Sequence, residues 1–509
     1  MGTINQRKAG VILSYVNLII GCIVPLLYTP VMLRLMGQAE YGLYSLSHSI
    51  IGYLTLLNLG MGSVIVRYTA RYRAENKVDD IRRLSGMFLA IYGVMALVVF
   101  AVGAVLVWKA DTLFAEGLTS AEVARLRILM VLLVISTALS LPTSVFSSVI
   151  SAYERYVFLR GFGIITTIAI PCLNLVVLFL GGASVGIVYV GLSVQVFSGL
   201  LYIWYSSRKL HIRPTFKNMP IRLLKEIVVF SSFLLLSSIA DMLYWATDKV
   251  LIGARLGTVA VAVYNVGGVF TTMMQNMSQA ISNVFTPKVM MLSVQDDSAK
   301  ATSDLLKRIG RLQFFIVSFI LSGYTVFGQI FIYLWAGEGY ESAYFVALLT
   351  MVPLGVPLIQ SIAYSSCVAQ NKHRFRAIIY AIIAVINVAT TYVVLPRYGI
   401  IGAAVCTAVA FLLGNGIIMN IYYAKKLNLD IAGFWVTIGK IAAVPIVMTA
   451  VSYCIFNMVI IADSWIVLFM SAVVYTAVFW IATWFVSMNI DEKALFQSLF
   501  QKVVCVFVK

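Results

Sequence analysis

Long apolar stretches dominate this chain, and short polar breaks separate them. Each stretch has about 20 residues or more, the length that a helix needs to cross roughly 30 Å of hydrocarbon. Because a bilayer offers no water to backbone polar groups, we predict that each stretch is an α-helix. The pattern predicts about 14 transmembrane helices. They are expected near residues 10–34, 42–66, 84–108, 127–152, 157–180, 183–206, 226–254, 258–285, 312–336, 343–369, 377–395, 399–424, 433–459 and 464–488.

The composition supports a membrane-embedded chain. Of its 509 residues, 61% are hydrophobic and only 11% are charged. Soluble domains average roughly 45–50% apolar and about 25% charged residues, so a soluble globular protein is excluded. The N-terminal stretch MGTINQRKAGVILSYVNLII has the basic start of a signal peptide, but its apolar part is too long, so we expect a retained first helix. The predicted fold class is an all-α polytopic membrane protein.

The basic residues are distributed unevenly over the loops. The chain has 37 lysines and arginines against 20 acidic residues, a net charge of +17. Most of them fall in every second loop, on the side of the N-terminus, as in the loop RYTARYRAENKVDDIRR. The positive-inside rule therefore predicts a multi-pass membrane protein whose two termini are cytoplasmic. No loop is long enough for a nucleic-acid surface, whereas anionic membrane lipids remain expected partners.

Catalytic and cofactor signatures are missing from the sequence. The six cysteines are scattered without CxxC spacing, and the three histidines are far apart, so we expect no metal site. There is no GxxxxGK[ST] phosphate loop, which argues against an ATPase. We therefore name no catalytic residue, metal or cofactor.

The second half of the chain repeats features of the first. Three segments in common order pair Gly37 with Gly257, Arg160 with Arg376, and Gly186 with Gly402. The repeat predicts two parallel six-helix lobes, as in transporters whose halves rock around a central site. A channel is the alternative, without a filter motif to support it. The expected parts are a first lobe at 1–206, a basic cytoplasmic linker at 207–225, a second lobe at 226–424, and two additional helices with a cytoplasmic tail at 425–509.

Five segments carry a resemblance to a known family. They are LMGQAEYGLYSL, LNLGMGSVIVRYTARY, ATDKVLIGARLG, VAQNKHRFRAIIYAIIAVINV and YGIIGAAVCTAV. In these segments, and in its arrangement of twice six helices plus two, the chain resembles the multidrug/oligosaccharidyl-lipid/polysaccharide (MOP) exporter superfamily. Within it the chain looks most like the polysaccharide biosynthesis, Wzx-type O-antigen flippases. The resemblance covers most of residues 8–424 and implies a MATE-like fold.

The resemblance implies a secondary transporter rather than an enzyme. Such a protein flips a polyprenyl-diphosphate-linked oligosaccharide from the cytoplasmic to the periplasmic leaflet by alternating access, with coupling to H⁺ or Na⁺ left open. The resemblance also implies a monomer that works with a polysaccharide polymerase and chain-length proteins. The alternatives are a MATE-type drug/cation antiporter, a lipid II flippase, and a membrane glycosyltransferase or polymerase. Short outward loops disfavour the last of these.

Two carboxylates interrupt the apolar stretch SSIADMLYWATDKVLIGARLG. Asp241 is expected near mid-membrane, and Asp248 falls on the same face of the same helix. An isolated charge at mid-membrane costs about 2.5–3.5 kcal/mol, so Asp241 needs a cavity or a partner. Asp248 is expected nearer the periplasmic end, where Lys249 or Arg255 is the expected ion-pair partner. One hypothesis is that Asp241 and Asp248 couple cation movement to transport. The alternative is that they only pack helices through ion pairs or hydrogen bonds.

A diphosphate substrate requires cationic partners, preferably the forked donors of arginine. Arg34 and Arg255 are predicted near the outer mouth, and Lys249 lies next to Asp248. Arg67 and Arg71 are predicted at the inner end of the second helix, where they would receive the headgroup. The alternative to diphosphate binding is that each of these residues is an interfacial anchor, an ion-pair partner or a topology signal.

Prolines inside apolar segments suggest bending points, because each removes a backbone hydrogen bond. Pro353 and Pro357 are the best hinge candidates, and Pro25 and Pro30 are the next. Proline is common in membrane helices, so a purely structural role is the alternative.

Overall fold

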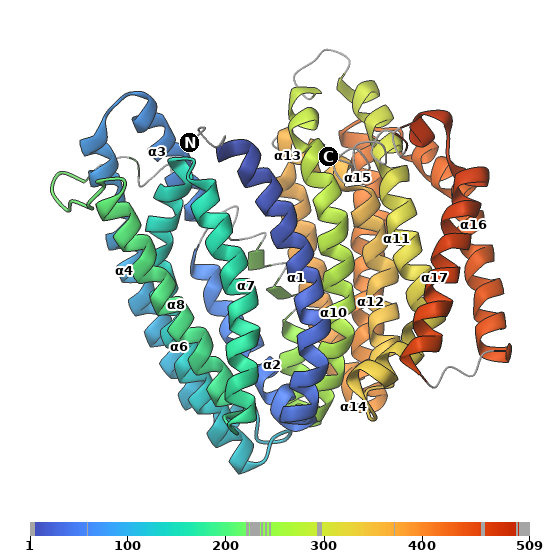
Figure 1. The fold of residues 1–509 in the computed structure, drawn as a ribbon, viewed down its shortest axis with the longest axis horizontal. Helices are drawn as coiled ribbons and strands as arrows, with labels where there is room; N and C mark the ends of the chain where they lie inside the picture. The colour runs from blue at the N-terminus through green and yellow to red at the C-terminus, as the bar shows by residue number, and fades with distance from the viewer. Residues whose placement is uncertain are drawn as a thin grey trace. The chain divides into compact units, whose positions relative to one another are not determined.

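The computed structural model describes residues 6–58, 60–219, 246–292, 298–370, 372–459 and 464–494, with isolated positions at 223, 235, 238, 239, 242, 243 and 497. Every regular element in these ranges is a helix (Figure 1). The predicted all-α polytopic class is therefore confirmed. The α-helices are α1 (Gln6–Met36), α2 (Gln38–Gly52), α3 (Met61–Ala74), α4 (Val78–Trp108), α5 (Ala110–Leu113), α6 (Ser120–Ala152), α7 (Tyr156–Phe179), α8 (Ala183–Arg208), α10 (Thr247–Leu292), α11 (Ser298–Ala336), α12 (Ser342–Ile359), α13 (Ser361–Ala369), α14 (His373–Phe411), α15 (Met419–Lys426), α16 (Ile431–Val459) and α17 (Trp465–Ala482).

Twelve helical segments in the described residues are long and apolar enough to cross a membrane. The two longest are Thr247–Leu292 with 46 residues and Arg374–Lys426 with 53. A straight helix of 46 residues would measure about 69 Å, more than twice the hydrocarbon thickness. Each contains a non-helical glycine, Gly257 or Gly399, close to a predicted helix boundary. The multi-pass membrane fold is thus established, whereas the count of fourteen stays a prediction.

The repeat predicted from the sequence has a counterpart in the backbone. Gly37 precedes α2 with φ 78° and ψ 168°, and Gly257 interrupts α10 with φ 85° and ψ −177°. These angles lie in a region that only glycine adopts without strain. The two glycines paired by the repeat therefore make the same kind of turn between helices.

The chain divides into two compact units that interleave along the sequence. One unit contains residues 1–265 and 380–403, and the other contains 266–379 and 404–509. In the first, α6 packs against α4 and α8, and α1 packs against α7. In the second, α11 packs against α12 and α16. The predicted lobe boundaries at 206, 225 and 424 stay predictions.

An aromatic cluster holds the C-terminal helices in the second unit. Phe479 of α17 is fully buried in one cluster with Tyr475 of the same helix and Phe456 of α16. Tyr475 also donates a hydrogen bond to Ser322 Oγ of α11 at 2.6 Å. Aromatic pairs of this kind add about 0.5–1.5 kcal/mol each beyond the area they bury. The additional helices α16 and α17 are therefore integral to this unit.

Candidate functional site

The second transmembrane segment is broken in the middle. α2 ends at Gly52, a 3₁₀ turn covers Tyr53–Asn58, and α3 begins after Gly60, which has φ 61°. Tyr92 of α4 donates to Asn58 Oδ1 at 2.8 Å, and the Tyr53 hydroxyl bonds to Thr247 Oγ1 of α10. Broken helices place unpaired backbone groups inside the membrane, which is where transporters build their sites.

Asp248 is buried beside this break. Only 1% of its surface is exposed, and its Oδ2 accepts a hydrogen bond from the Tyr264 hydroxyl at 2.6 Å. Both residues belong to α10 and lie on opposite sides of the turn at Gly257. A charged carboxylate at this depth needs such donors, because desolvation is expensive. The fold therefore supplies a dedicated partner for Asp248.

Lys249 connects α10 to α2 through two further side chains. Its Nζ donates to Asn265 Oδ1 at 2.5 Å, and Asn265 Nδ2 donates to the Tyr41 hydroxyl at 2.7 Å. Lys249 is half-buried, whereas Asp248 is fully covered. The two neighbours in sequence thus use different partners. We call Asp248, Lys249, Tyr264, Asn265 and Tyr41 the polar cluster.

His48 extends this cluster along α2. Its ring stacks at a tilt on Tyr44 with centroids 4.3 Å apart, and its Nδ1 lies 3.1 Å from the Tyr44 carbonyl oxygen. Because a carbonyl oxygen only accepts, Nδ1 carries a proton in this geometry. His48 is exposed, while Ser45 and Ser49 beside it are buried. The sequence prediction missed His48, Tyr41 and Asn265.

A close-packed seam lies next to the polar cluster in the same unit. A Cβ on Gly42 of α2 would sit 1.8 Å from the Thr258 carbonyl oxygen, and a Cβ on Gly117 would sit 2.2 Å from that of Gly253. Backbones therefore touch directly at both points. Thr258 Oγ1 also donates to Glu122 Oε1 at 2.7 Å. We call these contacts the glycine seam.

Arg255 lies on α10 between the seam residues Gly253 and Thr258. Its Nη1 lies 2.6 Å from Glu116 Oε2, its Nη2 donates to the Tyr392 hydroxyl, and its guanidinium lies 4.8 Å from the centre of the Tyr392 ring. Arg255 therefore has a carboxylate partner in this structure. It connects α10 to the segment that contains Glu116 and to Tyr392 of α14.

Three further predicted site residues, Arg34, Arg67 and Arg71, are exposed on α1 and α3. Arg34 is exposed in the last turn of α1, and Arg67 is exposed on α3. Arg71 pairs with Glu75 at 3.1 Å on the surface. Asp241 lies outside the described residues. The structure therefore brings together Asp248 and Lys249, with Arg255 on the adjacent seam.

The hinge candidates occupy different settings. Pro353 and Pro357 lie in α12, which ends at Ile359 and continues as α13 after a break at Gln360. Gln360 Nε2 donates to Asn420 Oδ1 at 2.7 Å, and Asn420 Nδ2 donates to the carbonyls of Asn415 and Gly416 in a π-helical turn. Pro25 and Pro30 lie inside the uninterrupted α1. The prolines of α12 thus precede a real break.

No group of three or more histidine, cysteine, aspartate or glutamate side chains with metal-binding geometry occurs in the part of the chain that the structure describes. The polar cluster offers one carboxylate, one ammonium, an amide and two phenols. This set is suited to binding ions or polar groups and to moving with the helices that carry it.

Comparisons with known proteins agree with one another. The family model described as polysaccharide biosynthesis protein matches residues 8–293. A putative O-antigen transporter of Shigella flexneri is 19% identical over 398 residues, which cover 76% of this chain and 91% of the relative. A probable low-salt glycan biosynthesis flippase of Haloferax volcanii is 23% identical over 236 residues, covering 46% of this chain and 48% of the relative.

Solved structures share the fold at lower identity. The lipid II flippase MurJ in an inward closed conformation has a TM-score of 0.65 at 13% identity, covering 92% of this chain and 98% of that chain. An outward-facing multidrug resistance MATE family transporter of the MOP superfamily has a TM-score of 0.56 at 15% identity, covering 85% and 97%. The MATE-like fold expected from the sequence is therefore confirmed.

Proposed function

Because the chain belongs to the polysaccharide biosynthesis protein family, we propose that it flips a polyprenyl-diphosphate-linked oligosaccharide from the cytoplasmic to the periplasmic leaflet of the inner membrane. Family membership confirms the resemblance predicted from the sequence, and the relatives are transporters and flippases rather than enzymes. The direction, the substrate and the cytoplasmic position of both termini are parts of the proposal.

The observation that carries the proposal is the polar cluster inside membrane-spanning helices. Burying Asp248 and Lys249 in an apolar chain is costly, and such residues in transporters line substrate or ion pathways. In our proposal Lys249 and the neighbouring His48 meet the diphosphate during transport, and Asp248 is the cation-coupling residue. Asp241 stays a sequence-based candidate for the same role. Arg34, Arg67 and Arg71 are proposed to guide the headgroup at the two openings.

Alternating access in this proposal uses the glycine seam as the outer closure. α2 and the first turns after Gly257 separate when the passage opens outward and rejoin when it opens inward. The Arg255–Glu116 and Thr258–Glu122 contacts hold the closed form. Arg255, predicted to bind diphosphate, therefore has a second proposed role as a latch. A substrate diphosphate that competes for Arg255 would help to release it.

Deleting the gene tests the proposal. We expect lipid-linked repeat units to accumulate in the cytoplasmic leaflet, with surface polysaccharide lost and restored by the wild-type gene. Normal polysaccharide together with reduced resistance to cationic drugs would contradict the flippase and favour the drug/cation antiporter. Accumulation of lipid II in place of the repeat unit would favour the lipid II flippase, whose substrate is a peptidoglycan precursor.

A further inference from the structure

The polar segment after α8 is fastened to the start of α4. Ile212 is 1% exposed, and its N–H donates to the Ser206 carbonyl at 3.1 Å. Thr215 N donates to the Arg82 carbonyl at 3.0 Å, and Arg82 Nη2 donates to the His211 carbonyl at 3.2 Å. We call residues 208–218 the basic strap.

A glycine on α4 makes this docking close. A Cβ at Gly86 would lie 2.1 Å from the Thr215 carbonyl oxygen, so the strap backbone rests directly on the helix. Only glycine leaves room for that approach. Because α8 is a membrane-spanning segment that ends at Arg208, the docked strap is held within a few residues of the bilayer surface.

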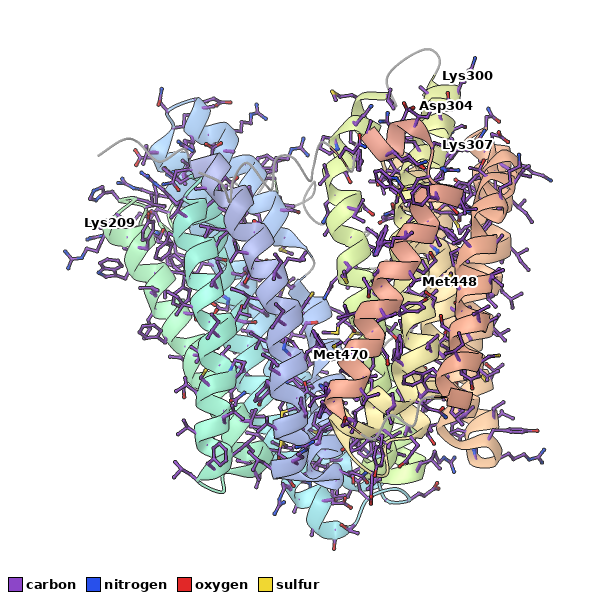
Figure 2. All side chains as sticks on the ribbon, turned by 45° about the vertical axis from the view of Figure 1, so that its right-hand side comes forward. Lys209, Lys300, Asp304, Lys307, Met448 and Met470 are labelled. Carbon is purple, nitrogen blue, oxygen red and sulfur yellow. The ribbon has the colours of Figure 1, made fainter. Side chains whose placement is uncertain are left out.

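The strap presents four cations without acidic partners. Arg208, Lys209, Arg213 and Lys217 are exposed, and none of them forms an ion pair with any residue that the structure describes. Figure 2 labels Lys209 at the end of α8, on the periphery of the helices. The sequence has no aspartate or glutamate between residues 207 and 225. The strap is therefore uniformly positive.

Acidic residues near the docking point are already neutralised. Asp79 pairs with Arg82 at 3.0 Å, and Asp80 pairs with Arg83 at 3.7 Å. In the preceding loop, hydrogen bonds from Lys77 and Arg71 hold the pKa of the Glu75 carboxyl below its ordinary value. These carboxylates thus pair with cations outside the group of four on the strap. The positive charge of the strap is therefore available to an external anionic partner.

Aromatic side chains accompany the four cations. Phe216 is 57% exposed within the strap, and Trp204 is 50% exposed in the last turns of α8. Cations and exposed aromatics together are typical of segments that lie at the headgroup level, where the ring enters the apolar boundary and the charges meet phosphates. A soluble acidic partner would satisfy the charges, but it would leave both rings in water.

We propose that the basic strap is a binding site for anionic phospholipid headgroups of the leaflet on its side of the membrane. Lys209, Arg213 and Lys217 contact headgroup phosphates, and Phe216 inserts among the acyl chains. Docking on α4 fixes the backbone in advance, so little conformational entropy is lost when the lipid binds. The site is separate from the polar cluster and does not depend on which substrate is transported.

Lipid retention during purification tests the proposal. The full chain is reconstituted with equal amounts of phosphatidylglycerol and phosphatidylethanolamine, extracted gently, and its bound lipids are counted by native mass spectrometry. We expect wild type to retain phosphatidylglycerol preferentially. The variant Lys209→Ser/Arg213→Ser/Lys217→Ser should lose that preference by about tenfold or more, since each cation near an anionic surface contributes to binding.

A matched variant separates the site from general positive charge. Lys288→Ser/Lys425→Ser/Lys426→Ser removes three equally exposed cations elsewhere and should keep the preference. Phe216→Ser should lower retention while leaving the charge unchanged. Equal losses in both triple variants, or no preference in wild type, would overturn the proposal. Competition by inorganic phosphate as effective as by phosphatidylglycerol would replace the lipid with a free anion. Thermal unfolding in detergent checks that each variant folds.

Discussion

Asp248 and its neighbour Lys249 show how two adjacent charged residues can each be given a hydrogen-bond partner inside a membrane-spanning helix. Tyr264 donates to the carboxylate, and Asn265 accepts from the ammonium. Both partners come from the helical segment beyond Gly257, where two adjacent residues serve both charges. Hydrogen bonds to charged groups contribute about 1.5–3 kcal/mol each, enough to offset part of the desolvation. The arrangement keeps both charged groups hydrogen-bonded, which the proposed transport role requires.

Replacing Asp248 by asparagine keeps the shape and removes the charge. We expect transport of the lipid-linked oligosaccharide to fall at least about tenfold, a loss of roughly 1.4 kcal/mol or more, while the protein still folds. Complementation of the deletion strain, with membrane expression measured in parallel, checks this. The exposed Asp79→Asn serves as a control and should complement fully. Full complementation by Asp248→Asn would remove the carboxylate from the mechanism.

A second buried charge pair has a structural role. Arg311 of α11 makes a fork to Glu492 at 2.6 and 2.8 Å and donates to the Ser487 carbonyl at 2.8 Å. The two side chains are only 11% and 7% exposed. The pair therefore fastens the segment after α17 to α11.

Arg311→Met should destabilise the protein by about 3–5 kcal/mol, because it leaves the Glu492 carboxylate buried without its cation. Arg311→Met/Glu492→Leu should recover most of that loss. Thermal or denaturant unfolding in detergent measures both. The exposed pair of Lys307 and Asp430 is the comparison, where Lys307→Met should change stability by about 0–1 kcal/mol. A double variant no more stable than Arg311→Met would argue against the ion pair as the cause.

At the scale of elements, the glycine seam lets the backbones of two segments touch without intervening side chains. Gly42→Val would drive a side chain into the Thr258 carbonyl region, where even a Cβ has only 1.8 Å. We expect the seam to stay open, transport to fall at least about tenfold, and a cysteine at position 258 to become reactive toward membrane-impermeant thiol reagents. The labelling is done from the outside in a background without the native cysteines.

Gly93→Ala is the control for the seam variant, because a Cβ there meets no atom within 4 Å. It should transport normally and leave position 258 protected. If Gly42→Val transported at the wild-type rate with position 258 still protected, the seam would not be the outer closure.

Two irregular elements in the second unit form hydrogen bonds to the same side chain, that of Asn420. Asn420 bonds to Gln360 at the break between α12 and α13, to carbonyls of the π-helical turn at 412–418, and to Trp435 Nε1 of α16 at 2.8 Å. π-turns are frequent at functional sites, and breaks of this type act as hinges. Asn420 therefore couples the hinge candidates Pro353 and Pro357 to the π-helical turn and to α16.

Asn420→Leu should cost about 1–3 kcal/mol, because it leaves the buried Gln360 amide without its partner. Transport should decline more than the stability loss explains, since the two irregular elements are no longer connected. Unfolding in detergent and proteoliposome transport measure the two effects separately. Asn420→Asp, which keeps the acceptor for Gln360, should retain more of both. Equal transport in the leucine variant and wild type would mean that the hinge works independently.

At the scale of the whole molecule, the sequence predicted the fold well because membrane helices follow from apolar length alone. It also paired Gly37 with Gly257, whose backbone angles nearly coincide. The two segments of 46 and 53 residues run together where the prediction separated helices, because a single non-helical glycine, Gly257 or Gly399, marks each predicted boundary.

The candidate site was predicted only in part. Asp248 and Lys249 stood out as charges in an apolar stretch, and the structure gives both of them polar partners. Tyr41 and Asn265 did not stand out, because a tyrosine or an asparagine in a membrane helix carries no distinctive pattern until the helices meet. The spacing of Tyr41, Tyr44 and His48 on one face of α2 was the available signal. Arg255 was proposed for diphosphate because its acidic partner, Glu116, lies far away in sequence.

The paired turns at Gly37 and Gly257 also constrain how this gene can vary. A side chain at either position would adopt a backbone conformation that costs about 1–3 kcal/mol. In a deep mutational scan selected for surface polysaccharide, both codons should tolerate almost no replacement, while the flanking lipid-facing positions accept many. If both positions tolerate no replacement, the same backbone requirement acts at corresponding places in the two halves, as expected for halves that arose by duplication.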